Sequence, residues 1–170
     1  MNTEIEILIE RAKKIAGRKD TENKNSEEIK NIVEFLLIPE RYAFESKYVS
    51  EVLTLKEITS IPGTPAFVMG VINLRGRIIS VINLKVLFNI KEKGLTELNK
   101  VIILKNESME FGIIVDAILA NKVLDSNTLK QPPLTLDSFG IECVEGVSNE
   151  GLILLNADNL LKSKQIVISK

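Results

Sequence analysis

The chain has 170 residues, 45% of them hydrophobic, which is enough to bury one sizeable core, and a second independent domain is not expected. Its 22 basic and 23 acidic side chains give a formal net charge of -1 and are interspersed, which excludes the basic stripe of a nucleic-acid-binding protein and a polybasic membrane anchor. With no histidine and a single cysteine, it lacks the usual ligands of zinc, the Ser-His and Cys-His nucleophile systems, and any internal disulfide.

Residues 1–30 predict an amphipathic helix followed by a polar linker. The apolar side chains of the helix fall three and four positions apart, on one stripe of about 13 residues: Ile5, Leu8, Ala12 and Ile15. Residues 18–30 are dominated by Asn, Asp, Glu, Lys and Ser, a composition typical of a flexible linker. We expect the helix to dock on its own domain or on a partner, because so short a helix is marginal alone.

The N-terminus also bears on localisation. Acidic residues stand where a signal peptide needs a basic and then an apolar stretch. No apolar run approaches the roughly 20 residues that span a bilayer. We therefore expect a cytoplasmic protein.

Residues 62–84 contain two apolar strands joined at one charged turn. Arg75-Gly76 separates residues 71–74 from residues 77–82, which predicts a β-hairpin with glycine supplying a positive φ, buried along both strands. The planar guanidinium of Arg75 suits recognition of a carboxylate or of backbone carbonyls on another surface. Arg75 is therefore a candidate docking residue, the alternative being a solvated turn residue without a binding role.

The second half of the chain repeats features of the first. Gly70-Val71-x-Asn73 recurs as Gly146-Val147-x-Asn149, and each copy is followed by an apolar strand, an Asn at 83 or 156, and a brief helical segment. Two units of related plan are indicated, about 31–90 and 99–161. A mainly β fold built from a duplicated small β-barrel is the economical interpretation.

Few residues could carry catalysis. Asp116 lies in the apolar stretch 111–120, where it is either an acid of raised pKa or, as we favour, a structural residue at the solvent end of a strand. Cys143 is expected to be packed in a strand with Ile141, Val144 and Val147 rather than reactive. We predict no catalytic residue, no cofactor and no metal site.

The hairpin motif carries a resemblance to a known family. It is Pro62-x-x-Pro65-x-Phe67-Val68-x-Gly70-Val71-x-Asn73-Leu74-Arg75-Gly76-x-Ile78-Ile79-x-Val81-Ile82-x-Leu84. This pattern resembles the signature of the CheW family, the coupling proteins of bacterial chemotaxis, and the similarity extends from Phe35 to Leu161. The chain departs from the family at Ser80, usually Pro, and at Asn83, where Asp is common. The resemblance implies a CheW-like domain over 31–170, with two five-stranded SH3-like β-barrels that share a core.

The resemblance also implies a function without chemistry. The protein would be an adaptor that couples the cytoplasmic tip of a methyl-accepting chemoreceptor to the regulatory domain of a CheA-type histidine kinase. By alignment, the receptor-facing positions are Val49, Glu51 and Arg75, with Leu74 and Gly76 shaping the turn. Glu51 and Arg75 are candidates to face each other. The kinase-facing positions would be Ser46, Tyr48 and Val49.

Three alternatives stay open at this point. The first is a CheW-like scaffold of a non-chemotactic receptor–kinase array, such as one controlling surface motility or development. The second is an enzyme on a double barrel, which requires a pocket with convergent polar groups. The third, a nucleic-acid binder, ranks last because two Tyr, six Phe and no Trp offer few stacking platforms.

Overall fold

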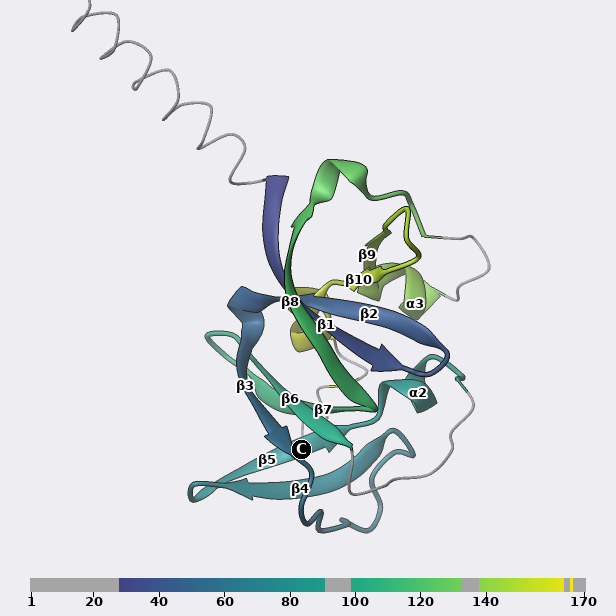
Figure 1. Cartoon of the computed structure of the whole chain (residues 1–170). Coiled ribbons are helices and arrows are strands. Elements are labelled where there is room, and N and C mark those ends of the chain that lie inside the picture. The colour runs from purple at the N-terminus through teal and green to yellow at the C-terminus, as the bar shows by residue number, and fades with distance from the viewer. Residues whose placement is uncertain (1–27, 91–98, 133–137, 164–165, 167–170) are drawn as a thin grey trace, which may run out of the picture.

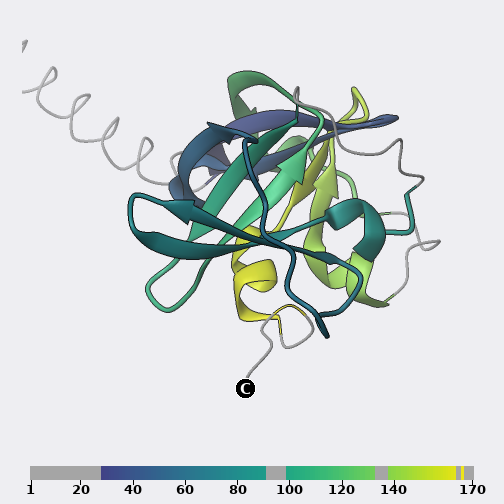
Figure 2. The same cartoon turned by 90° about the horizontal axis from the view of Figure 1, so that it is seen from below.

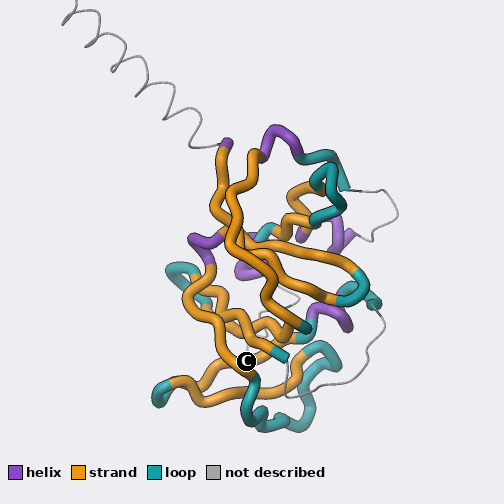
Figure 3. The backbone as a smooth tube through the Cα atoms, viewed as in Figure 1, coloured by secondary structure: helices purple, strands orange, loops and turns teal. Residues whose placement is uncertain are grey.

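The computed structural model describes residues 28–90, 99–132, 138–163 and 166, and within them the fold is mainly β (Figures 1 and 3). The strands are β1 Ile29–Leu37, β2 Glu40–Glu45, β3 Val49–Thr54, β4 Val68–Leu74, β5 Arg77–Ile82, β6 Lys100–Lys105, β7 Glu110–Val115, β8 Ala117–Asp125, β9 Val144–Val147 and β10 Ile153–Leu155. The helical segments are η1 Ser46–Tyr48, α2 Leu84–Leu87, η2 Ser126–Thr128, α3 Ser138–Cys143 and α4 Ala157–Lys162.

The predicted N-terminal helix lies outside the described residues, but the end of the predicted linker does not. Ile29 and Lys30 belong to β1, where they pair with Asp125 and Leu124 of β8. The linker prediction is therefore wrong at its last two residues. Backbone pairing across nearly a hundred positions overrides the polar local composition.

The strands form two five-stranded sheets. Sheet A has the order β8-β1-β2-β10-β9 and sheet B the order β3-β6-β7-β5-β4. Neighbours are antiparallel, except that β2 pairs with β10 and β5 with β7 in parallel. In Figure 1 sheet A forms the upper part of the molecule and sheet B the lower part, with β3 descending along the left side from one to the other.

The two repeat units exchange strands. A duplicated barrel would place each unit in its own sheet, whereas β1 and β2 of the first unit lie in sheet A with β8, β9 and β10 of the second. β6 and β7 of the second unit likewise join β3, β4 and β5 in sheet B. The repeated motifs nevertheless occupy matching places. Val71 forms an isolated bridge with Thr59, and Val147 forms one with Lys130.

One hydrophobic core lies between the sheets. Sheet A contributes Phe35, Tyr42 and Phe44, and sheet B contributes side chains from β5, β6 and β7, with α4 covering one end. Phe35 and Phe44 have no exposed surface and stack with ring centroids 5.0 Å apart. Full burial of such a side chain contributes about 1.5–3 kcal/mol. Each sheet also has one smaller cluster on its other face, formed by residues that alternate along the strands with those of the shared core.

The short helices after the repeated asparagines are confirmed. The side chain of Asn83 accepts a hydrogen bond from the amide of Lys85, and Asn156 accepts one from the amide of Asn159. Asparagine is a strong helix N-cap because its side-chain oxygen satisfies an amide that the first turn leaves unpaired. The departure from the family at Asn83 therefore leaves the cap of α2 in place.

The hairpin is confirmed, but its burial along both strands is wrong. Leu74, Ile79, Val81 and Ile82 are buried, whereas Ile78 is 67% exposed. Side chains alternate across a strand, and no described element covers the outer face of β5 near the turn. The hairpin (dark teal) projects from the side of the molecule in Figure 2.

The expectation for Cys143 is half right. Its side chain is buried, at 1% exposure, as predicted for a packed cysteine. It ends helix α3, however, and the strand begins only at Val144. The apolar spacing of residues 141–147 does not distinguish the last turn of a helix from the start of a strand.

Asp116 joins the two sheets. It lies between β7 and β8 and pairs with Lys85 of α2, with Nζ to Oδ2 at 2.7 Å. The same Oδ2 also accepts a hydrogen bond from the amide of Ile38, in the β1–β2 turn of sheet A, at 2.8 Å. Lys85 is 7% exposed, so the ion pair is largely shielded from water. Asp116 is structural, as favoured from the sequence. Its carboxylate, however, links α2 to the β1–β2 turn inside the molecule and does not extend into solvent.

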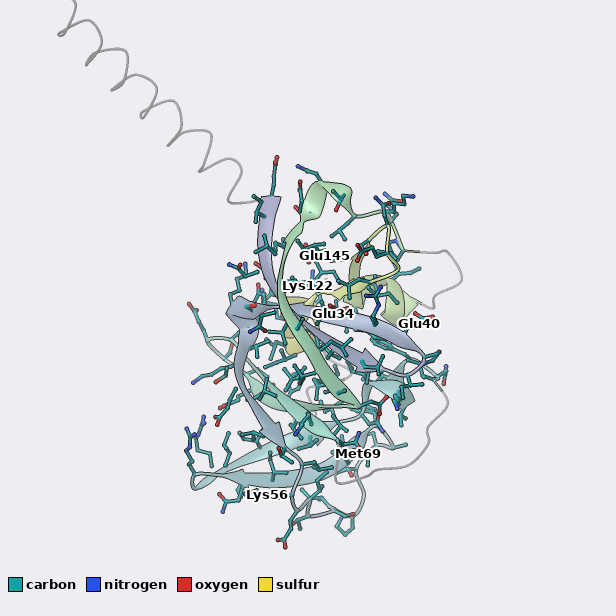
Figure 4. The ribbon with its side chains drawn as sticks, in the orientation of Figure 1. Glu34, Glu40, Lys56, Met69, Lys122 and Glu145 are labelled. Carbon is teal, nitrogen blue, oxygen red and sulfur yellow. The ribbon has the colours of Figure 1, made fainter. Side chains whose placement is uncertain are left out.

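Sheet A contains a buried carboxylate that the sequence did not single out. Glu34 of β1 is 1% exposed and pairs with Arg41 of β2 at 3.1 Å and Lys122 of β8 at 2.7 Å. Glu34 and Lys122 lie next to each other over the crossing of β1 and β8 in Figure 4. Two cations from the neighbouring strands thus compensate the burial of one charge.

Candidate functional site: the hairpin tip and strand β3

The tip of the β4–β5 hairpin is a two-residue turn. Arg75 and Gly76 have φ values of 53° and 85°, the pattern of the hairpin turns whose twist matches the flanking strands. The side chain of Asn73 accepts a hydrogen bond from the amide of Gly76 at 2.9 Å. This role of Asn73 was missed, although an asparagine three positions before a glycine is a signal of such a turn.

Arg75 and Glu51 face each other across the space between the hairpin and β3. Nη2 of Arg75 donates to Oε1 of Glu51 at 3.0 Å. The side chain of Arg75 is 77% exposed and that of Glu51 is 24% exposed. The facing arrangement is thus confirmed. It leaves most of the guanidinium open to solvent, where the remaining N–H donors can bind a partner.

Of the other two hairpin candidates, Leu74 is buried and Gly76 is exposed. Leu74 is 7% exposed and packs in the cluster inside sheet B. Gly76 has no atom within 4 Å of the position that a Cβ would take. Leu74 therefore anchors the turn to the hydrophobic cluster of sheet B, and Gly76 supplies the positive φ that the turn needs. Both residues thus shape the turn.

Strand β3 lies beside two hollows. A groove of about 470 Å³ between β3 and sheet A is lined in part by Val33, Val49, Glu51, Val52, Ile118 and Asn121. A second hollow of about 380 Å³ lies between β3 and β4, with walls that include Leu53, Lys56, Ile72 and Asn73. Val52 is 40% exposed and lines both. The groove thus brings Val49 and Glu51 onto one accessible, mainly apolar surface.

The predicted kinase-facing residues continue directly into that surface. Ser46 and Tyr48 belong to η1, the turn that leads into Val49 at the start of β3. Tyr48 packs partly against the main core, and Nζ of Lys47 lies 5.1 Å from its ring centre. Burial lowers the pKa of Lys47, but the charge and hydrogen bond of Glu45, together with those of Tyr48, outweigh it and raise that pKa above its usual value. The kinase-facing set therefore adjoins Val49 and Glu51 of the receptor-facing set in one continuous stretch of chain.

The groups that the site exposes suit the binding of another protein. Within the ranges that the structure describes, no group of three or more His, Cys, Asp or Glu side chains could hold a metal ion. Every helix among those same residues is too short or too polar to cross a membrane. The features that stand out are an exposed arginine, a fixed carboxylate and an apolar groove, which are the elements of a protein-binding surface.

The two packed β-sheets and the exposed hairpin tip define a small β domain with a candidate binding surface, and comparisons with known proteins identify its class. The CheW-like domain family matches residues 31–165. The "Chemotaxis protein CheW" of Treponema pallidum is 32% identical over 142 residues, which cover 79% of this chain and 84% of that protein. The "Protein FrzA" of Myxococcus xanthus is 27% identical over 72% of this chain and 79% of its own length.

A solved structure agrees. The scaffolding protein TtCheW from Thermoanaerobacter tengcongensis superposes with a TM-score of 0.69 at 36% identity, over 79% of this chain and 94% of that one. The chain belongs to the CheW family of chemotaxis scaffold proteins. The resemblance found in the hairpin motif is confirmed, and the family match extends over residues 31–165.

Proposed function

We propose that this protein is a non-catalytic chemotaxis adaptor that couples the cytoplasmic tip of a chemoreceptor to the regulatory domain of a CheA-type histidine kinase. The observation that carries the proposal is the exposed Arg75 fork, paired with Glu51 at the edge of an apolar groove, in a chain of the CheW family. The proposed location is the cytoplasmic face of receptor arrays, reached through these partners.

The receptor would bind along the groove. Val49 and Val52 offer apolar contact at its wall, while Arg75 offers charge-assisted hydrogen bonds at its end. Glu51 fixes the guanidinium in one orientation, so less side-chain freedom is lost on binding. Leu74 and Gly76 hold the turn that presents Arg75.

The kinase would bind at Ser46, Tyr48 and Val49. Because Val49 belongs to both proposed sets, a complex of all three proteins requires the partners to approach β3 from its two ends. Affinities in the micromolar range, about -8 kcal/mol per interface, fit an array whose parts exchange and which gains strength from multivalency.

We also propose that each sheet closes into an SH3-like barrel within a domain over 31–170. The bridges Thr59–Val71 and Lys130–Val147 support closure, since each joins the chain that follows one edge strand to the opposite edge strand of the same sheet. Both carbonyls and both amides are used in each bridge, at 2.8–2.9 Å.

A second candidate is a scaffold for a non-chemotactic receptor–kinase array. The similarity to FrzA favours keeping it, because that relative does not carry the chemotaxis name. The same binding surface would serve either array. The receptors and kinases whose genes neighbour the gene of this protein would therefore distinguish the chemotactic role from the non-chemotactic one.

The test is reconstitution with receptor-bearing membranes and the organism's own kinase. Adding this protein should carry the kinase regulatory domain into the membrane pellet and make kinase activity respond to the receptor. Membranes without receptor are the control. A regulatory domain that stays in the supernatant, with folded protein present, would contradict the adaptor assignment.

A further inference from the structure

The face of β1 and β8 that packs in the shared core continues beyond the core as an exposed apolar surface. Residues two positions apart along a strand share a face, and so do residues that stand opposite each other in an antiparallel pair. On this face of β1, Phe35 belongs to the shared core and Val33 next to it is buried. Further along, Ile29 is 47% exposed and Val123 of β8 is 67% exposed. The face therefore stays apolar where it meets water.

The register of the two strands makes these side chains neighbours. Asn31 pairs with Val123, and Ile29 stands two positions before Asn31, so Ile29 and Val123 are diagonal neighbours on one face. Val33 pairs with Asn121, and both line the groove beside β3. The β1–β8 strip, as we call Ile29, Val33 and Val123, thus leads from the groove to the first residue of β1.

The chain enters the described part of the domain at this strip. Ile29 begins β1, and the start of β1 and the end of β8 lie side by side at the upper end of sheet A (Figure 1). Residues 1–27 precede the described ones, and for them the sequence predicts an amphipathic helix with the apolar stripe Ile5, Leu8, Ala12 and Ile15. The chain thus brings an apolar stripe to an exposed apolar strip.

The dimensions of the stripe and the strip agree. From residue 5 to residue 15 a helix rises about 15 Å, and from Ile29 to Val33 a strand extends about 13 Å. A linker of the predicted kind between Ile15 and Ile29 spans about 20 Å. The predicted helix can therefore fold back along the whole strip without strain in the linker.

We propose that residues 5–15 dock as a helix on the β1–β8 strip of their own chain and cover the open end of the groove beside β3. Burial of its apolar stripe is what such a short helix needs, because it is marginal alone. Val33 belongs to the strip and also lines the groove, so the docked helix competes with the receptor for part of that groove. The docking stands on its own, whereas the competition rests on the proposed function.

The docking is tested by disulfide formation within the full chain in a glutathione redox buffer. Ala12→Cys with Asn31→Cys places one thiol in the stripe and one on the exposed face between Ile29 and Val33. The native Cys143 is 1% exposed and competes little. Glu10→Cys with Asn31→Cys is the matched control, because position 10 is two residues from position 12 and faces away from the stripe on a nearly equal tether. The first pair should reach an effective concentration at least about tenfold above the control.

Two charged substitutions locate the contact. Leu8→Glu in the stripe or Val123→Glu in the strip, each added to the Ala12 and Asn31 pair, should lower its effective concentration to that of the control. Equal values for the two cysteine pairs, or no effect of either charged substitution, would overturn the docking. Disulfide-linked dimers in place of intramolecular bonds would also overturn it and would assign the strip to a second copy of the chain.

The competition is tested by co-sedimentation with receptor-bearing membranes, using chains without added cysteines. Leu8→Glu should bind receptor at least about threefold more tightly than the parent, because its groove is no longer covered. Glu10→Gln, on the other side of the helix, should bind as the parent does. Equal binding by Leu8→Glu and the parent would refute the competition. Absence of receptor binding by every variant would contradict the adaptor function, while the cross-link would still decide the docking.

Discussion

Substituting the exposed arginine of the hairpin separates binding from stability. In the Arg75→Glu variant two carboxylates face each other where the parent has a pair at 3.0 Å, with the Arg75 side chain 77% exposed. An exposed pair contributes about 0.2–1 kcal/mol, so the melting temperature should fall by no more than about 4 °C. Loss of one charge at a desolvated interface costs about 2–5 kcal/mol, which predicts at least a 30-fold weaker receptor interaction.

The assay is co-sedimentation with receptor-bearing membranes, with thermal unfolding measured on the same samples. Arg77→Glu is the matched control: it makes the same change of charge on the same hairpin, at a residue paired with Glu110 at 2.7 Å. It should keep receptor binding within about threefold. Restoring the pair by combining Arg75→Glu with Glu51→Arg should recover stability but not binding. Equal losses in the Arg75 and Arg77 variants would refute the reasoning, because net charge alone would then explain them.

Three further predictions concern the fold. Gly70→Ala should lower the free energy of unfolding by about 2–4 kcal/mol in urea, because Gly70 has a φ of 142° and an added Cβ would lie within van der Waals overlap of the Thr59 carbonyl. Lys85→Met should destabilise the protein by about 3 kcal/mol, since it leaves the carboxylate of Asp116 without its cation. Lys85→Arg should recover part of this loss. A neutral effect of Lys85→Met would contradict a stabilising role for the shielded ion pair of Lys85 and Asp116. Because the folded state raises the pKa of Tyr42 from 10 to about 12, its contribution is complete below pH 10 and is lost between pH 10 and 12 at up to about 1.4 kcal/mol per pH unit. Tyr42→Phe should remove that part of the alkaline dependence.

The local features of the fold were predictable because they depend on neighbours in sequence. The two-residue turn at Arg75 and Gly76 follows from apolar strands on both sides of a glycine. The caps at Asn83 and Asn156 follow from the preference of asparagine for that position. The facing of Glu51 and Arg75 was expected only through the family, since 24 positions separate them.

The features that the sequence did not reveal are long-range. Nothing in the periodicity shows that β1 and β2 pair with strands of the other repeat unit, because register and partner choice depend on the whole sheet. The burial of Glu34 is also invisible locally: its two cations come from β2 and β8, and the latter is more than 80 positions away. The exposure of Ile78 likewise depends on which face of β5 stays uncovered.

The central claim is that this chain couples a kinase to receptors. Isothermal titration against the regulatory domain of the organism's own CheA-type kinase tests it most directly. We expect saturable binding in the micromolar range, weakened when Tyr48 of η1 and Val49 at the start of β3 are replaced together by charged residues. No heat of binding from a folded sample, at concentrations well above that range, would contradict it.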